Sequence, residues 1–254
     1  MTVHHAAQGF RRDVGAYERG RPAYPEEAVS AIAREFGLSP SSTILDLAAG
    51  TGKFTRALLS TRARLVAVEP LVEMRAQLVN GVEGVEALEG TAESIPLADK
   101  SVDAVTVAQA FHWFANDAAL AEIHRVLRSD GGLALIWNRR DLTQPLQRAV
   151  DDIVNPFRRD TPSHRAGRWR VVIDTNHLFA LANELHVSNM QELDAPALVD
   201  RVMSTSFIAE LYGDDRERVT TRLEELISSL PARFSLAYVT DVHCYRSTMT
   251  EESD

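Results

Sequence analysis

The chain of 254 residues has 27 Lys and Arg against 36 Asp and Glu, a formal net charge of −9 at pH 7. An acidic surface repels phosphate backbones, so this balance disfavours nucleic acid as a partner. The single cysteine, Cys244, excludes an intrachain disulfide, and we expect it to pack as a small apolar residue. The N-terminal stretch lacks the apolar segment of a signal peptide, and no run approaches the roughly 18 apolar residues of a membrane span. We therefore expect a cytoplasmic protein without membrane contact.

Helix and strand patterns alternate from residue 25 onwards. Pro25 followed by two glutamates is typical of a helix start, and the apolar spacing predicts a helix over 25–36. The short apolar runs that follow predict strands over 43–49, 63–70, 85–92, 101–110 and 133–138. The stretches between them predict helices over 52–61, 71–80 and 117–132. This repeated alternation favours a parallel, doubly wound sheet.

The pattern is less regular in the last part of the chain. Residues 143–182 resemble helical pieces, and an alternating run predicts a sixth strand over 184–193. Two amphipathic patterns predict helices over 195–211 and 215–230. The alternation over 234–246 is typical of an edge or antiparallel strand.

Together these elements predict an α/β fold. We expect a doubly wound, mostly parallel, Rossmann-like sheet with an antiparallel late strand and a helical insertion. A single domain is expected over 1–254. Its N-terminal cap would span about 1–38, its core about 39–142, and a helical lid with the last strands about 143–254.

The stretch LDLAAGTGKFT places two glycines between a predicted strand and a predicted helix. Glycine at Gly50 and Gly52 permits a tight turn and the close approach of a ligand to backbone N–H groups. A phosphate-binding loop would need glycine and Ser or Thr where this chain has Leu47 and Phe54, so that interpretation fails. A dinucleotide site would need a third glycine where Thr55 stands, which weakens that interpretation.

Glu69 stands at the end of the second predicted strand, 17 residues after Gly52. This spacing places its carboxylate beside the glycine loop, where it can accept two hydrogen bonds from a ribose diol. Nucleotide cofactors and S-adenosylmethionine both carry that ribose. The alternative is a surface glutamate at a strand end, and the adjacent glycine loop favours the ribose role.

Four stretches resemble, in order, the motifs of class I S-adenosylmethionine-dependent methyltransferases. They are LDLAAGTGKFT (45–55), VAVEP (66–70), GTAESIPLADKSVDAVTVAQAFHWF (90–114) and EIHRVLRSDGGLALIWN (122–138). The nearest resemblance is to the small-molecule branch, methyltransferase type 11, which includes trans-aconitate and ubiquinone-pathway methyltransferases. YERGRPAYPEEAV (17–29) also resembles the N-terminal segment of that branch, whereas the late region matches only loosely.

The resemblance implies where the cofactor binds. The acidic residue that matches Glu69 binds the ribose hydroxyls, the loop that matches 46–52 holds the methionine part, and the segment that matches 91–93 recognises the adenine. The N-terminal segment folds over the cofactor, where Tyr17 or Arg21 would hold the methionine carboxylate, unless the segment is a surface strap with salt bridges. The implied cofactor-binding set is Tyr17, Arg21, Asp46, Ala48, Gly50, Gly52, Glu69, Pro70, Thr91, Ala92, Glu93 and Gln109.

Two positions depart from the family pattern. Ala48 replaces the commonest glycine of the loop, and its methyl group is tolerated there if φ is negative. Thr91 replaces the usual aspartate before Ala92, which leaves the contact to the adenine amino group open to Glu93 or a backbone carbonyl.

QAFHWF follows the fourth predicted strand, so its side chains should reach the carboxyl edge of the sheet, where ligands bind. His112, with an ordinary pKa of about 6.5, suits a general base, and a positioning or a structural role stays open. Trp113 and Phe114 would wall the acceptor pocket or cover the sulfonium by a cation–π contact, unless they only pack the loop against the late helices. His112 and Trp113 are the catalytic candidates.

Other polar and aromatic residues receive weaker assignments. Trp137 and Asn138 end the fifth strand and are expected to line the acceptor side, and His124 is expected to be structural. The sequence does not decide whether His164 and His177 reach the pocket. Seven arginines are expected to be solvated or paired with carboxylates, namely Arg139, Arg140, Arg158, Arg159, Arg165, Arg168 and Arg170.

The leading hypothesis is S-adenosylmethionine-dependent methyl transfer to a small-molecule acceptor, which yields S-adenosylhomocysteine and needs no metal. One alternative is a non-catalytic S-adenosylmethionine-binding regulatory protein. Another is a tRNA or protein methyltransferase, which would need a basic groove at the carboxyl edge of the sheet. A nicotinamide-dependent oxidoreductase is disfavoured by the missing third glycine. The methylated atom and the oligomeric state stay open.

Overall fold

A mixed β-sheet organises the chain. The computed structural model describes residues 14–248, so the first part of the expected N-terminal cap lies outside the described residues. Within the described part, seven strands pair in the order β3-β2-β1-β4-β5-β7-β6. Their bounds are β1 Thr43–Leu47, β2 Arg64–Val68, β3 Glu86–Leu88, β4 Val102–Ala108, β5 Leu127–Arg140, β6 Phe179–Leu193 and β7 Phe234–Ser247.

The first five strands are parallel, and β7 is antiparallel to both of its neighbours. The predicted fold class, a mostly parallel sheet with an antiparallel late strand, is confirmed. β7 lies inside the sheet between β5 and β6, so β6 forms the edge. Residues 240–245 of β7 are buried on both faces, whereas the residues before them alternate in burial. These earlier residues account for the alternation seen in the sequence.

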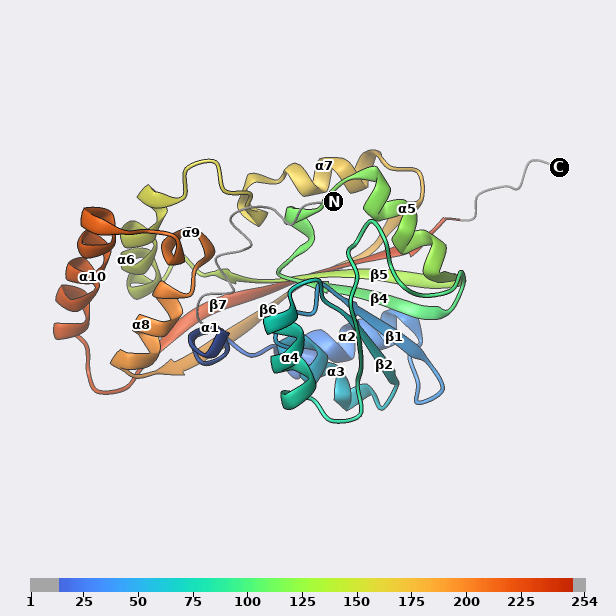
Figure 1. Ribbon diagram of the computed structural model, residues 1–254, viewed down its shortest axis with the longest axis horizontal. Helices are drawn as coiled ribbons and strands as arrows, with labels where there is room; N and C mark the ends of the chain where they lie inside the picture. The colour runs from blue at the N-terminus through green and yellow to red at the C-terminus, as the bar shows by residue number, and fades with distance from the viewer. Residues whose placement is uncertain (1–13, 249–254) are drawn as a thin grey trace.

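The helices cover both faces of the sheet and one end of it. Their bounds are α1 Val14–Gly20, α2 Glu26–Phe36, α3 Lys53–Leu58, α4 Val72–Gly81, α5 Asp117–Val126, α6 Pro145–Val154, α7 Arg168–Thr175, α8 Ala195–Met203, α9 Ser206–Ala209 and α10 Gly213–Ser228. On one face, Ile32 of α2 and Phe54 of α3 share a hydrophobic cluster with Ile44 of β1. The other face is covered by α5 and α7 (Figure 1). Ile123 of α5 and Ile173 of α7 belong to a second cluster there. None of the described helices is long and apolar enough to cross a membrane.

Four helices lie together beside the last residues of β6 and the first residues of β7 (Figure 1). They are α6, α8, α9 and α10, and are called the lid helices below. They have a hydrophobic cluster of their own, in which Val150, Leu198 and Val219 pack with Leu236 and Tyr238 of β7. Because β7 also pairs with the last residues of β5, this cluster holds the lid helices next to the carboxyl end of the sheet.

Three predicted boundaries are wrong. The helix expected over 117–132 ends at Val126, because Leu127 already pairs with Val102 of β4. The helix expected over 195–211 is interrupted at Thr205, whose extended backbone separates α8 from α9. The last of the helical pieces expected before residue 182 belong to β6, which begins at Phe179 and pairs with β7 throughout its length. Cys244 is buried in β7, as expected.

Gly132 of β5 permits α2 to lie against the sheet. A Cβ at this position would fall 2.2 Å from Cε1 of Phe36. We expect Gly132→Ala to lower the free energy of unfolding by about 1–3 kcal/mol, because the buried ring must shift. In a chain of this size each kcal/mol corresponds to roughly 2–4 °C in Tm, measured by thermal unfolding. Gly81→Ala is the control, because its Cβ would meet only the flexible end of Arg56 at 3.1 Å. Equal Tm values for the two variants would contradict the tight contact.

Candidate functional site

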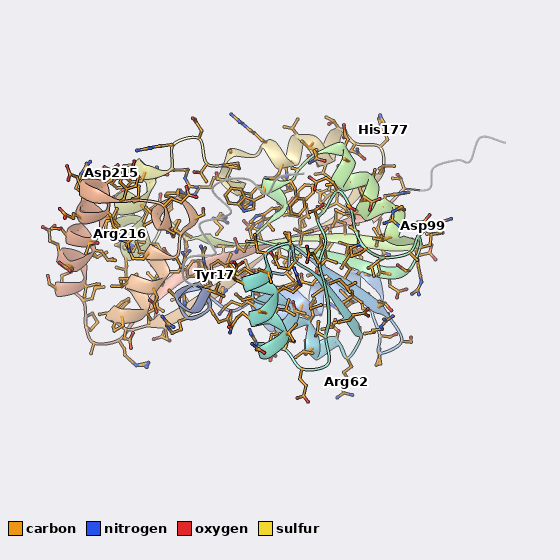
Figure 2. The ribbon with its side chains drawn as sticks, viewed as in Figure 1. Tyr17, Arg62, Asp99, His177, Asp215 and Arg216 are labelled. Atoms are coloured by element: carbon orange, nitrogen blue, oxygen red, sulfur yellow. The ribbon has the colours of Figure 1, made fainter. Side chains whose placement is uncertain are left out.

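A cavity of about 440 Å³ opens at the carboxyl ends of β1, β2, β4 and β5. This is the edge at which open α/β sheets bind ligands, and the strand order reverses there between β1 and β4. Side chains of α1, α6, α8 and α9 border the other side. Figure 2 shows Tyr17 of α1 between the lid helices and the parallel strands, and His177 at the outer edge of the molecule. A volume of this size suits a small ligand.

The glycine loop forms one wall of the cavity. Gly50 has a φ of 58°, and a Cβ added to it would meet no atom within 4 Å. Gly52, with a φ of 78°, does not line the cavity: a Cβ there would lie 2.9 Å from Leu78 and 2.9 Å from Val82. The first glycine thus faces the cavity, and the second permits close packing of the loop against α4.

Ala48 lies in the same loop with a φ of 57°, and its neighbour Ala49 donates its N–H to the carbonyl of Val68 at 3.2 Å. The condition under which the methyl group would be tolerated without strain, a negative φ at Ala48, is not met. The chain must turn sharply after β1, and this left-handed conformation costs a residue with a Cβ about 1–2 kcal/mol. The loop therefore keeps the shape that glycine normally supplies, at the cost of backbone strain.

Glu69 joins the loops that follow β1 and β2. Its side chain is buried, with 5% of the residue exposed, and it borders the cavity. One carboxylate oxygen accepts the N–H of Gly50 at 2.9 Å, and the other accepts the N–H of Leu71 at 2.9 Å. Burial raises the pKa of this carboxyl, and the two backbone hydrogen bonds oppose the rise. The carboxylate is therefore held in one orientation, with lone pairs left for a ligand.

Asp46 is buried in β1 next to the glycine loop and does not line the cavity. It accepts hydrogen bonds from the hydroxyls of Thr55 at 2.5 Å and Thr106 at 3.1 Å. Burial raises its pKa to about 7, although both hydroxyls favour the ionised form. The carboxyl links β1 to α3 and to β4, so it supports the loop from within the protein.

The segment after β3 forms the neighbouring wall, where Thr91, Ala92 and Glu93 all line the cavity. The backbone of Thr91 pairs with Ser94 in a tight turn, at N···O distances of 3.3 Å and 3.2 Å. The carboxylate of Glu93 accepts a hydrogen bond from the amide of Asn116 at 3.1 Å. The predicted site residues of this segment are thus brought beside the glycine loop, together with Pro70.

His112 follows β4 and lies next to Trp137 of β5. Trp137 donates its indole N–H to Nδ1 of His112 at 3.3 Å. Burial lowers the pKa of His112 to about 3, and the nearby charges of His164 and Arg158 lower it further. Because the indole occupies Nδ1, the neutral ring carries its proton on Nε2 and can act there as a donor. Trp113 and Gln109 line the cavity beside it.

The segment that contains α1 closes the cavity. Glu18 accepts hydrogen bonds from Thr51 of the glycine loop at 2.6 Å and from Arg56 of α3 at 3.1 Å. Arg21 stacks over Tyr17 at 4.7 Å and donates to the carbonyl of Ser204 at 3.0 Å. Within the described residues, Nε of Arg21 is buried without a hydrogen-bond partner, a position that suits an anionic ligand atom.

All of the predicted site residues except Asp46 and Gly52 line one cavity. Trp137 and Asn138 line it too, as expected, and so does Phe114, in agreement with a place in the wall of the pocket. His164 also reaches it, with its ring 4.5 Å from that of Trp137, whereas His177 and His124 do not.

Sequence reasoning missed a group of arginines. Arg140 and Arg165 are paired with Asp151, as expected, but both also line the cavity. Arg158 and Arg201 line it too, and Arg201 had not been considered. The unusual density of arginine after β5 was the one available signal.

Comparison with known proteins agrees with this geometry. A family model described as a methyltransferase domain matches residues 45–135. An uncharacterised methyltransferase-like protein of Schizosaccharomyces pombe is 37% identical over 223 residues, which cover 87% of each chain. An uncharacterised methyltransferase of Mycobacterium tuberculosis is 38% identical over 94% of this chain and 95% of its own. Among solved structures, a candidate type II methyltransferase of Anaeromyxobacter dehalogenans has a TM-score of 0.67 and 21% identity, and the match covers 89% of this chain and 97% of that one.

The chain therefore belongs to the methyltransferase family. Its fold and its ordered motifs are those of a class I methyltransferase, and the protein is an enzyme of that class.

The strain at Ala48 predicts that Ala48→Gly stabilises the protein. Relief of the left-handed conformation gains about 1–2 kcal/mol, and the greater freedom of glycine in the unfolded chain takes back about 0.5–1 kcal/mol. The net gain of about 0.5–1 kcal/mol corresponds to a rise in Tm of roughly 1–4 °C, measured by thermal unfolding. Ala49→Gly is the matched control, because Ala49 is not among the residues with positive φ and should lose stability. A fall in Tm for both variants would contradict the strain at Ala48.

Proposed function

We propose that the protein transfers a methyl group from S-adenosylmethionine to a small-molecule acceptor and releases S-adenosylhomocysteine. The observation that carries this proposal is the buried carboxylate of Glu69, which borders the cavity beside Gly50. A ribose diol placed there would meet a fixed acceptor, and the absent Cβ of Gly50 leaves room for it.

The other residues of the cavity wall fit the rest of the cofactor. The buried, unpartnered Nε of Arg21 would meet the methionine carboxylate, with Tyr17 beside it. Thr91, Ala92 and Glu93 would border the adenine. The bound cofactor supplies an electrophilic methyl group on a sulfonium, which an in-line nucleophile displaces. Asp46 and Gly52 would act indirectly by supporting the loop.

The remaining half of the cavity, between the ends of β4 and β5 and the lid helices, is assigned to the acceptor. It is enclosed by side chains from α6, α8 and the segment between α6 and α7. An enclosed cavity excludes water and fixes the nucleophile, which are the main requirements of methyl transfer. This enclosure and the net charge of −9 favour a small molecule over a nucleic acid, and a cytoplasmic location stays a prediction.

His112 is proposed as a positioning donor and Trp113 as part of the acceptor wall. The hydrogen bond from Trp137 uses the one ring nitrogen of neutral His112 that could take a proton. Its low pKa has the same consequence, because a ring with a pKa of about 3 is a weak base at neutral pH. The N–H on Nε2 would instead orient the acceptor or its nucleophilic atom.

Calorimetric titration with S-adenosylmethionine and S-adenosylhomocysteine tests the cofactor assignment. We expect binding by the wild type and a loss of roughly tenfold or more in affinity for Glu69→Ala, the scale of a lost charged hydrogen bond. Glu86→Ala removes the same charge from exposed β3 and should bind like the wild type. Thermal unfolding confirms that Glu69→Ala is folded. Unchanged affinity in a folded Glu69→Ala variant would exclude the ribose role.

The pH profile of the reaction tests the role of His112. Because its pKa is about 3, His112 stays neutral, and its titration should not change kcat/KM between about pH 5.5 and 8. With an acceptor identified by release of S-adenosylhomocysteine, His112→Gln should retain more activity than His112→Ala, since the amide can still donate. His124→Ala, outside the cavity, is the control. An acidic limb near pH 6.5 that disappears in His112→Gln would show instead that His112 is a general base.

A further inference from the structure

Positive charge gathers in the acceptor half of the cavity. Four side chains form this group, called the arginine cluster below: Arg140, Arg158, Arg165 and Arg201. Asp151 of α6 is the only acidic side chain among the described residues that line this half, since Glu69 and Glu93 belong to the cofactor half. One carboxylate against four guanidinium groups leaves a surplus of positive charge inside a protein whose net charge is −9.

Asp151 is shared between two members of the cluster. One of its oxygens accepts from Arg140 at 2.9 Å, and the other accepts from Arg165 at 2.9 Å. The side chains of Arg140 and Asp151 are each 10% exposed. Water therefore does little to screen this pair, whereas the side chain of Arg165 is 35% exposed. A single carboxylate neutralises the two guanidinium groups only in part.

The other two members of the cluster bind no carboxylate among the described residues. Arg201, 6% exposed, donates to the hydroxyl of Tyr238 at 3.0 Å. Arg158 donates to the side-chain oxygen of Asn155 at 3.2 Å and stacks on Phe207 at 4.9 Å. Burial lowers the pKa of Arg140 to about 10, and the charge of Arg201 adds to this effect. The pKa of Arg158 is lowered for the same reason, with Arg165 as the added charge.

Such a cluster costs free energy in the absence of a counter-charge. The exposed arginines nearby show the ordinary alternative, since Arg159 is 75% exposed and pairs with Asp215 at 3.5 Å. Planar guanidinium groups match the geometry of carboxylates and phosphates and bind them through paired hydrogen bonds. An anion bound among the four arginines would supply the missing counter-charge.

The arginine cluster also extends from the cavity toward the surface of the protein. A second, more open hollow is lined by Arg139, Arg140, Asp141, Leu142, Thr143, Arg148 and Arg165. Arg139, Arg140 and Arg165 border both spaces. Arg139 has a carboxylate of its own in Asp241 at 2.9 Å, whereas Arg140 and Arg165 share the single carboxylate of Asp151. Arg140 and Arg165 therefore provide the surplus positive charge that connects the hollow to the cavity. This arrangement offers an anion a positively charged route to the acceptor half.

We propose that the methyl acceptor is a small anion whose carboxylate or phosphate group binds to Arg158 and Arg165 within the arginine cluster. The inference rests on the proposed function, because it names the class of acceptor for the same cavity. Arg158 lies near enough to His112 for its charge to affect the ring. The anchored group would thus lie beside the proposed positioning donor. The net charge of −9 disfavours a nucleic acid as the alternative acceptor.

Calorimetry on protein saturated with S-adenosylhomocysteine tests this proposal with three probes: glutarate, glycerol 3-phosphate and the neutral glutaramide. We expect at least one anion to bind, and glutaramide to bind at least tenfold more weakly. Stronger binding of glutarate identifies a carboxylate site, and stronger binding of glycerol 3-phosphate identifies a phosphate site. Equal affinity for glutarate, glycerol 3-phosphate and glutaramide, or no binding of either anion, would overturn the proposal. Displacement of the bound anion by bulk tRNA would overturn it in favour of a nucleic-acid substrate.

Two variants and a matched control locate the site. Arg158→Gln and Arg165→Gln should each weaken binding of the anion by roughly tenfold, as expected for a lost hydrogen bond between charged groups. Arg159→Gln removes the same charge one residue away, outside the cavity, and should bind like the wild type. Wild-type affinity for the anion in both cluster variants would overturn the assignment.

The affinity for S-adenosylhomocysteine, measured first on the same proteins, separates the two proposals. Absence of this binding in the wild type would contradict the proposed function. Normal binding in Arg158→Gln, together with loss of the anion, supports the acceptor site alone. Thermal unfolding of each variant verifies that it is folded.

Discussion

The site depends on one buried carboxylate that accepts backbone N–H groups from two loops. Glu69 binds the N–H of Gly50 after β1 and that of Leu71 after β2, so neither loop can move without breaking a hydrogen bond in a buried place. This explains why the protein tolerates a left-handed conformation at Ala48, which would otherwise favour a different turn. The loop shape is fixed by tertiary hydrogen bonds and not by the preference of each residue. A ligand therefore meets a surface that is already formed, and little free energy is lost in ordering it.

A second buried carboxyl extends this support into the sheet. Asp46 receives hydroxyl hydrogen bonds from α3 and β4, and so ties the glycine loop to the strand that leads to His112. The cofactor half and the acceptor half of the cavity are thereby fixed relative to each other through β1 and β4, which are paired directly. The lid helices are fixed in turn by β7, which pairs with β5 at one end and packs with Leu198 and Val219 at the other. Methyl transfer needs this alignment, since displacement at the methyl carbon tolerates little error in direction.

The sequence predicted the parts of the structure that local signals determine. The alternation of apolar runs identified the parallel strands, and residues at strand ends were placed correctly because the carboxyl ends of parallel strands share one edge. Local signals failed to predict the helix boundaries that tertiary packing determines. Helix propensity continues past Val126, yet pairing with β4 ends α5 there, and the extended residue Thr205 divides a sequence that is amphipathic throughout. The arginine cluster was not predicted, because Arg158 and Arg201 come from separate segments that meet only when the lid helices pack on β7.

The positive charge of the acceptor half bears both on which acceptor can bind and on whether methyl transfer needs a general base. The positive charge of Arg158 helps to keep His112 neutral, and the hydrogen bond from Trp137 occupies the nitrogen that would accept a proton. A cavity built in this way is poorly suited to remove a proton from a neutral nucleophile. It is well suited to an acceptor that arrives ionised, because such an acceptor brings its own reactive electron pair and also neutralises the cluster. On the proposal that the acceptor is an anion, a general base would be unnecessary where the anionic group is itself the nucleophile, and His112 would contribute by orientation alone.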